Sequence, residues 1–286
     1  MEKRLTAQGP KSRKSFTVTL PIEWVKEQKL DRTRAVDLAI VGNKAIISSG
    51  KNEAKRVIID MADYSKNTVK IVQGCYRAGI DEVLFKSDDS KILQEITEIM
   101  EQRLIGYEVI EQRRDSILVK DIANESSEDF KVIFRRILLL ILELSETNDI
   151  VQVKTLDRNI NKLINYCFRI LMKRGHTDYS KTHLYYLVLD RLEKVSDEFR
   201  WLYEDTLPIN SKIQDIDTIK KLLRSANELF FKFDAKNYSE FQFLAYQLRK
   251  KIRFLEKTSK ETIFTYNLSR LLNSLYGDIF TINACS

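Results

Sequence analysis

Two acidic side chains, Glu193 and Asp197, lie four residues apart in a segment whose apolar spacing predicts a helix. This spacing places both carboxylates on one helix face, where their oxygens suit a hard divalent cation. Because the chain holds 41 acidic residues among 286, about six such pairs are expected by chance. The alternative is therefore a solvated helix face, and a divalent metal ion is the one cofactor that the sequence suggests.

Cysteine and histidine offer little further chemistry. Cys75, Cys167 and Cys285 are odd in number and widely spaced, which argues against a disulfide framework and a zinc finger. His176 and His183 are too few for a histidine-rich metal centre, and we expect them near a helix cap and on a helix face. No pairing of nucleophile and base or glycine-rich phosphate loop is evident, so we expect a protein that is not an enzyme. A metal-dependent hydrolase built on the acidic pair is the enzymatic alternative.

Positive charge is concentrated at the start of the chain. Residues 1–56 hold 13 Lys and Arg against 6 Asp and Glu, whereas the remaining residues hold 35 of each. The net charge of +7 therefore belongs to the first fifth of the sequence. Such a local excess indicates a negatively charged partner, above all nucleic acid, with a solubilising basic arm as the alternative.

Five of these basic residues precede the first clear strand. Lys and Arg side chains in a loop contact phosphates, and Arg13 in addition suits bidentate contact with guanine. A basic loop without a partner is the alternative. The candidates for DNA contact in this stretch are Lys3, Arg4, Lys11, Arg13 and Lys14.

Composition limits the fold class. Eight Gly and three Pro are too few for the turns of an all-β protein of this length. The longest strongly apolar stretch, residues 137–142, is much shorter than the about 20 residues of a membrane span, and no signal peptide is recognisable. We therefore expect a mainly helical cytoplasmic protein without membrane insertion.

The first 50 residues have a β pattern. Residues 15–20 alternate polar and apolar side chains, as a half-buried strand does, and a short helix over 22–29 follows a proline. Two further strands, 36–41 and 44–48, flank a Gly-Asn pair that is typical of a hairpin turn. A segment this small cannot form a stable core alone, so we expect it to dimerise.

From residue 56 to about 122 the pattern is mixed. Strands over 57–59 and 83–85, a helix after each, and a closing hairpin over 107–119 give the order βαβαββ of a small α/β layer. We expect Ser65 to cap the first of these helices and Gly79 to end it.

The rest of the chain has the apolar spacing of helices. A linker around Pro208 divides them into three and three, the outline of two tandem three-helix bundles. We expect three domains, residues 1–52, 53–122 and 123–286. The six helices are expected near 127–147, 149–174, 178–204, 215–234, 238–258 and 260–283.

Two short stretches near the start carry a resemblance to a known family. Gln8-Gly9 is followed by Val18-Thr19-Leu20-Pro21-Ile22-Glu23-Trp24 and the predicted hairpin. This arrangement resembles the AbrB/MazE/SpoVT swapped-hairpin family, in which two chains interlace into one small β barrel that binds DNA. The resemblance implies such a barrel for residues 1–52 and adds Lys26 to the DNA-contact candidates. One departure is Thr33-Arg34, which stands where the family has a Gly-Asp turn.

Residues 102–108, 134–140 and 192–197 carry a second resemblance, to archaeal-type PhoU-like phosphate-signalling proteins, which bear this DNA-binding domain at the N-terminus. It implies a PhoU-like helical domain and a metal-binding E/D-x-x-x-D motif, which Glu193 and Asp197 match. Elsewhere in the chain the motif is degraded, because the second acid is replaced by asparagine.

The two resemblances together imply the fold class and the function. We expect an α+β, mainly α protein with a swapped-hairpin barrel, a small α/β middle layer and PhoU-like tandem three-helix bundles. It would be a homodimeric transcriptional regulator of phosphate uptake that binds double-stranded DNA. Its helical domain would receive a signal by binding a ligand, a metal ion, or a phosphate-transport or signalling protein. The alternative is a PhoU-like adaptor that regulates a phosphate transporter or kinase by protein contact, without DNA binding.

Overall fold

A computed structural model describes residues 3–10, 14–41, 44–49, 54–64, 67–123, 127–209, 213–253 and 259–284. The chain divides into two compact units, Met1–Glu53 and Ala54–Ser286. The protein is mainly helical with small sheets and a helical C-terminal region, so the expected α+β, mainly α class is confirmed.

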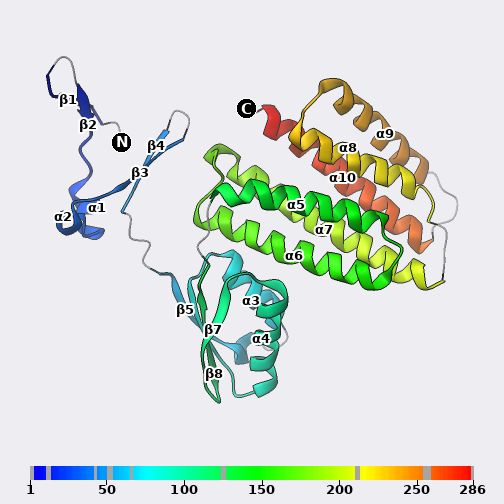
Figure 1. Ribbon diagram of the computed structural model, residues 1–286, viewed down its shortest axis with the longest axis horizontal. Helices are drawn as coiled ribbons and strands as arrows, with labels where there is room; N and C mark the ends of the chain where they lie inside the picture. Colours follow the sequence, from blue (N-terminus) through cyan, green and yellow to red (C-terminus); the bar gives the residue numbers. More distant parts are fainter. Residues whose placement is uncertain are drawn as a thin grey trace. The chain divides into compact units, whose positions relative to one another are not determined.

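The first unit contains two β hairpins and two short helices (Figure 1). Each hairpin is a separate antiparallel two-stranded sheet, so the interlaced barrel, which requires a second chain, stays a prediction. The strand expected over 15–20 ends at Thr17, and a second short helix follows the expected one. The elements are β1 (Thr6–Gln8), β2 (Ser15–Thr17), α1 (Ile22–Glu27), α2 (Leu30–Thr33), β3 (Asp37–Val41) and β4 (Lys44–Ser48).

This first unit buries little apolar surface. Leu30 is the one large apolar side chain that is buried among those described in residues 3–49. A unit of this size cannot gain stability from so small a core, because ordering its backbone costs about 1 kcal/mol or more per residue. Most of its described large apolar side chains are exposed instead; they are Leu5, Phe16, Val18, Ile22, Val36, Leu38, Ile40 and Ile46.

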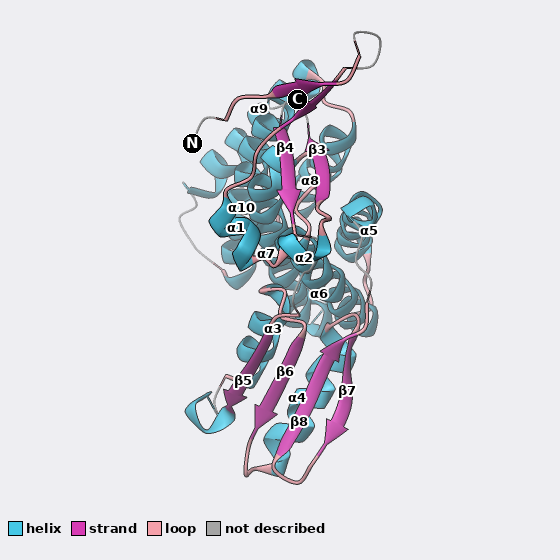
Figure 2. Ribbon diagram, turned by 90° about the vertical axis from the view of Figure 1, so that its left-hand side faces the viewer, coloured by secondary structure: helices cyan, strands magenta, loops and turns pink. Residues whose placement is uncertain are grey.

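The second unit begins with a four-stranded sheet that two helices cover on one face (Figure 2). The strand order is β5-β6-β8-β7, with β5 and β6 parallel and the other neighbours antiparallel. The sequence order of these elements is the predicted βαβαββ. They are β5 (Arg56–Asp60), α3 (Thr68–Arg77), β6 (Glu82–Lys86), α4 (Ser90–Arg103), β7 (Tyr107–Gln112) and β8 (Ser116–Asp121).

The boundaries of α3 were predicted only in part. Asn67 occupies its N-cap position, so the cap expected at Ser65 is wrong by two residues, and Ser65 itself lies outside the described residues. The expected end at Gly79 is confirmed, because this residue has a φ of +72°. A Cβ there would lie 2.8 Å from the Lys173 side chain, so glycine is required both by conformation and by space.

In the described residues from 127 onward, six long helices complete the second unit, as predicted. The first three pack on one another, the last three do the same, and α10 lies along α7 while α5 contacts α8 (Figure 1). Within the described ranges, no helix combines the length and apolar composition needed to cross a membrane. The helices are α5 (Ser127–Glu146), α6 (Ile150–Lys173), α7 (Thr182–Thr206), α8 (Ile216–Phe231), α9 (Ala235–Arg253) and α10 (Lys260–Ala284).

A fully buried arginine joins the sheet layer to the helices. Arg169, on α6, is 0% exposed and pairs with the Asp121 carboxylate at the end of β8. Its Nη1 donates a hydrogen bond of 2.8 Å to the carbonyl oxygen of Tyr76, and its guanidinium lies 5.0 Å from the centre of the Tyr107 ring. A buried guanidinium is tolerated only where carboxylates, carbonyls and aromatic faces replace water, as they do here.

Lys173, one helical turn after Arg169, extends this contact. Its Nζ lies 2.9 Å from both an Asp81 oxygen and an Asp121 oxygen. Burial alone would raise the pKa of Asp81, but the hydrogen bonds from Lys173 and from the Lys55 backbone N–H lower it. Two cations of α6 are thus balanced by two carboxylates from different strand ends, which fixes the sheet layer on this helix.

We expect Arg169→Met to lower the free energy of unfolding by about 3–5 kcal/mol, because it leaves the buried Asp121 carboxylate without its main partner. Urea denaturation followed by circular dichroism measures this loss. Arg136→Met, which removes an exposed arginine of α5, is the control and should change stability by less than about 0.5 kcal/mol. Equal losses in both variants would contradict a structural role for the buried pair.

Candidate functional site

The basic residues predicted to contact DNA are placed at the surface of the first unit where the structure describes them. Lys3 and Arg4 precede β1, Lys14 precedes β2, and Lys26 lies in the last turn of α1. All four are exposed. Lys11 and Arg13 lie outside the described residues, in the sequence between β1 and β2.

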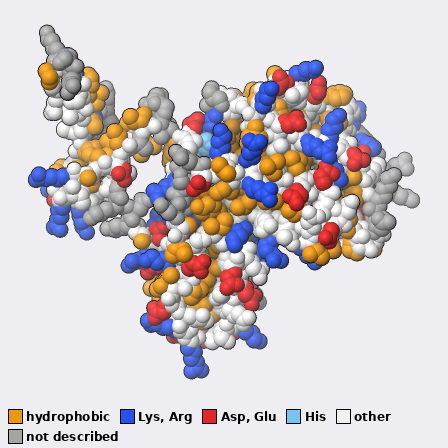
Figure 3. Space-filling view, viewed as in Figure 1, with side chains coloured by type: hydrophobic (Ala, Val, Ile, Leu, Met, Phe, Trp, Pro, Cys, Tyr) orange, Lys and Arg blue, Asp and Glu red, His pale blue; other side chains and the backbone are white. Residues whose placement is uncertain are grey.

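Further cations of the same unit were missed by the sequence analysis. Lys29, Arg32 and Arg34 flank or belong to α2 and are exposed. Figure 3 shows Lys and Arg side chains gathered where α1 and α2 lie. In the sequence, these cations were indicated only by the net charge of +7 over residues 1–56. A net charge does not show which cations lie on the same surface.

Among the side chains described in the first unit, no Lys or Arg has a carboxylate within 4.0 Å. The second unit differs, because most of its helices carry cations paired with acids, such as Arg200 with Glu204 at 3.1 Å. Cations without a local carboxylate remain available to an external anion, and phosphate is the anion that surface Lys and Arg bind most generally.

The predicted metal ligands lie on α7 and are occupied by arginines. Glu193 Oε1 accepts a hydrogen bond of 2.6 Å from Arg77, which also donates to Asn165 Oδ1 at 2.7 Å. Asp197 Oδ1 lies 3.7 Å from Arg200 Nη2. The helix does place both carboxylates on one side, but α3 and α7 supply each with a cation.

A third acid, Asp157 on α6, lies beside Asp197. Asp157 accepts hydrogen bonds from Ser196 Oγ at 2.9 Å and from Asn161 Nδ2 at 3.2 Å, and Arg200 Nε is 3.2 Å away. Burial, and then the charge of Asp157, raise the pKa of Asp197. Across the described ranges, no three His, Cys, Asp or Glu side chains are gathered as metal ligands, so a site on Glu193 and Asp197 stays a prediction.

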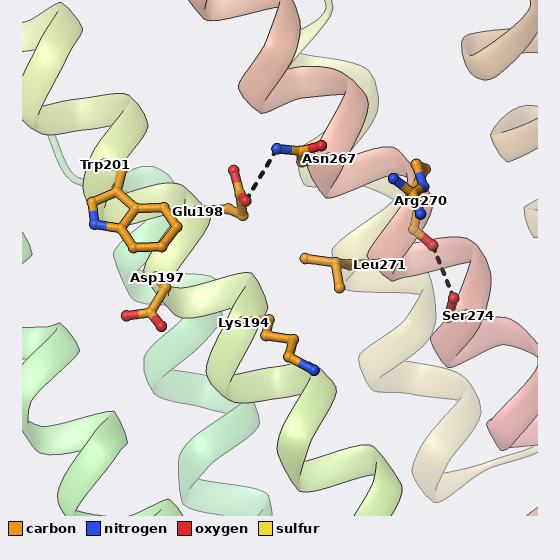
Figure 4. A pocket seen from close by; sticks show the side chains of 8 residues that line it. All are labelled: Lys194, Asp197, Glu198, Trp201, Asn267, Arg270, Leu271 and Ser274. Carbon is orange, nitrogen blue, oxygen red and sulfur yellow. Dashed lines mark hydrogen bonds between the residues drawn. The ribbon is translucent and has the colours of Figure 1, made fainter. Parts of the chain in front are cut away.

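A cavity of about 290 Å³ lies between α7 and α10, on the side of α7 next to this acidic group (Figure 4). Glu198 and Asn267 point toward each other across it and form a hydrogen bond of 3.2 Å. Burial raises the pKa of Glu198, and its second oxygen has no hydrogen-bond partner among the described residues. Trp201 adds an aromatic wall. The cavity suits a small ligand with a hydrogen-bond donor, but no nucleophile is paired with a base there.

His183 is an exposed residue of α7, on a helix face as expected, whereas His176 is packed against other side chains. His176 stacks on Tyr185 with 4.5 Å between ring centres, and burial lowers its pKa. Its Nδ1 accepts a hydrogen bond of 3.0 Å from the Asp178 backbone N–H in the loop before α7. The ring therefore packs on Tyr185 and supports the loop before α7, near the helix start where the sequence predicted it.

Comparisons of the chain with protein-family models, with curated proteins and with solved structures gave no match. The AbrB/MazE/SpoVT and PhoU-like resemblances therefore depend on the residues quoted above.

We expect Asp197→Asn to raise the free energy of unfolding at pH 7 by less than about 1 kcal/mol, since Arg200 already offsets part of the repulsion from Asp157. A carboxyl whose pKa is raised on folding stabilises the folded state in its protonated form, and this stabilisation is lost as the pH rises through the folded-state pKa. The gain from the neutral amide should therefore disappear below about pH 4.

Urea denaturation in EDTA between pH 3.5 and 8 measures this dependence. Asp190→Asn, on the same helix and paired with Lys194 at 2.5 Å, is the matched control and should show no gain at neutral pH. A loss of stability in Asp197→Asn at pH 7 would contradict the argument. Repeating the titration with Mg²⁺ or Mn²⁺ tests the metal prediction, because a bound ion stabilises the parent and not the variant.

Proposed function

We propose that this chain is a dimeric DNA-binding regulator whose first unit binds the duplex and whose second unit receives the signal. One observation carries the proposal: the unit that holds most of the excess positive charge also buries almost no apolar side chain among its described residues. A covering second copy would give this unit a core and would bring two sets of basic residues onto one duplex.

The pattern of exposed apolar side chains supports a second copy as the covering partner. Leu38 and Ile40, on alternate positions of β3, are 60% and 76% exposed. Ile46 on the paired strand and Phe16 on the other hairpin are also exposed. Two strand pairs with uncovered apolar faces match the interlacing that the AbrB/MazE/SpoVT resemblance implies, in which each copy supplies the core of the other.

The link to phosphate uptake rests on the PhoU-like resemblance of residues 102–108, 134–140 and 192–197. We propose that an effector binds in the cavity between α7 and α10 or at the acidic side chains beside it. A regulator needs two sites with coupled states, and we propose that this cavity is the second site. Double-stranded DNA and a second copy are thus the proposed partners, with a phosphate-transport or signalling protein as a third.

We expect the full chain to sediment as a dimer, and Ile40→Asp to weaken the dimer about 100-fold or more by placing a charge in the covered apolar face. Analytical ultracentrifugation across a concentration series measures this change. Val132→Asp, at an α5 position that is 71% exposed, is the matched control and should leave the dimer intact. A parent that remains monomeric at high micromolar concentration would rule out the interlaced unit.

We expect the triple variant Lys11→Ala, Arg13→Ala, Lys14→Ala to bind duplex DNA with a flatter salt dependence. Two protomers would bring six of these charges to the duplex, and each neutralised phosphate contributes about 0.9 to the slope of log K against log salt. The slope should fall by up to about five. Fluorescence anisotropy with a labelled duplex at several salt concentrations measures it.

The control for this experiment removes three exposed lysines of the second unit, Lys86, Lys91 and Lys120, and should leave the slope unchanged. Arg13→Ala alone separates two roles, because a loss confined to one sequence means base contact and a uniform loss means phosphate contact. Equal affinity of the triple variant and the parent would favour the adaptor, in which the first unit only dimerises.

A further inference from the structure

A second cavity, between α9 and α10, is lined by basic and aromatic side chains. Its volume is about 470 Å³. No carboxylate is among the lining side chains of this cavity, here termed the α9–α10 basic pocket. Its lining residues are Tyr246, Arg249, Lys250, Arg253, Tyr266 and Arg270.

The helical register brings these side chains together. On α9, Arg249, Lys250 and Arg253 follow Tyr246 by three, four and seven residues. All four therefore lie on one face of the helix. On α10, Tyr266 and Arg270 are four residues apart and face them. Arg270 lies over the Tyr266 ring, with 5.9 Å between the guanidinium carbon and the ring centre.

These cations are not balanced by the protein in the part of the chain that the structure describes. No carboxylate lies within 4.0 Å of Arg249, Lys250, Arg253 or Arg270 there. Lys251, the neighbouring residue on α9, instead pairs with Asp215 at 2.6 Å. Like charges at positions i and i+4 destabilise a helix. This clustering therefore costs folding stability unless an anion occupies the pocket.

One donor in the pocket is buried without a partner. Arg249 Nε is shielded from solvent and has no hydrogen-bond acceptor among the described residues. A buried donor left unsatisfied is unfavourable, and phosphate oxygens suit the planar, multi-donor edge of a guanidinium. Arg270, held against an aromatic ring, presents the same kind of edge from the opposite helix.

We propose that the α9–α10 basic pocket binds a small anion with two or more linked phosphate groups. Four cations and the 470 Å³ volume exceed what one orthophosphate needs, whereas ligand pockets for nucleotide-sized molecules span about 300–1,000 Å³. An inorganic oligophosphate and a nucleoside triphosphate share this chemistry. The exposed Tyr246 and Tyr266 rings would add stacking only for the nucleotide.

A small anion fits the pocket better than a duplex does. The cations converge from two helices into a cavity, whereas a DNA surface spreads its cations along the spacing of the phosphates. The inference does not depend on DNA binding by the first unit, because the pocket lies wholly within the second.

Isothermal titration of the full-length protein with tripolyphosphate, ATP and orthophosphate, all in EDTA, tests the proposal. The parent should bind tripolyphosphate saturably and orthophosphate at least about tenfold more weakly, because fewer guanidinium contacts form. The double variant Arg249→Ala, Arg270→Ala should lose about tenfold or more in affinity for tripolyphosphate while keeping its helix content and, without ligand, a melting temperature no lower than that of the parent.

The matched control is Lys251→Ala, which removes one cation from the same helix outside the pocket and should bind tripolyphosphate as the parent does. Tighter binding of ATP than of tripolyphosphate, abolished by Tyr246→Ala, would identify a nucleotide, and equal binding would identify the phosphate chain alone. Three results would overturn the proposal. They are absence of saturable binding at millimolar tripolyphosphate, equal affinity in the double variant and the control, or an effect of the double variant on duplex binding alone.

Discussion

The buried ion pair between Arg169 and Asp121 is the contact on which the second unit depends. It joins α6 to the end of β8, and the guanidinium lies close to both the Tyr76 and the Tyr107 ring. The four-stranded sheet already packs on α3 and α4, and the ion pair joins this layer to α6 of the helical region. Because charge pairs demand exact partners and apolar contacts do not, this junction also fixes the register of the layer on the helix.

Whether a cation has a carboxylate partner within the protein distinguishes structural contacts from candidate binding sites. Where α3, α6 and α7 meet, arginines and carboxylates satisfy one another, as Arg77 does with Glu193. Such a network holds helices together, and a metal would have to displace it. The described cations of the first unit and of the α9–α10 basic pocket lack carboxylates in the described chain, so they retain the capacity to bind an external anion. The same physical criterion thus weakens the predicted metal site and favours the proposal that the first unit binds DNA.

The sequence predicted the elements well and the sites less well, for a physical reason. Six amphipathic helices and the βαβαββ order follow from apolar spacing, which local periodicity encodes. The spacing of Glu193 and Asp197 correctly placed two carboxylates on one helix face, but Arg77 lies 116 positions away from Glu193, and no local pattern reveals it. The spacing of Tyr246, Arg249, Lys250 and Arg253 was visible in the sequence, yet its meaning required α10 opposite it.

The turn after α2 shows how the first unit departs from its resemblance and what that costs. Arg34 has a φ of +49°, the left-handed conformation that glycine adopts freely, at the place where the resemblance puts a Gly-Asp turn. Lys29, before α2, is also left-handed, with a φ of +54°. Each such residue costs about 1–2 kcal/mol, and Leu30 alone among the described large apolar side chains of this unit is buried to offset it. Two left-handed cations beside so small a described core agree with the proposal that a second copy covers the exposed strands β3 and β4.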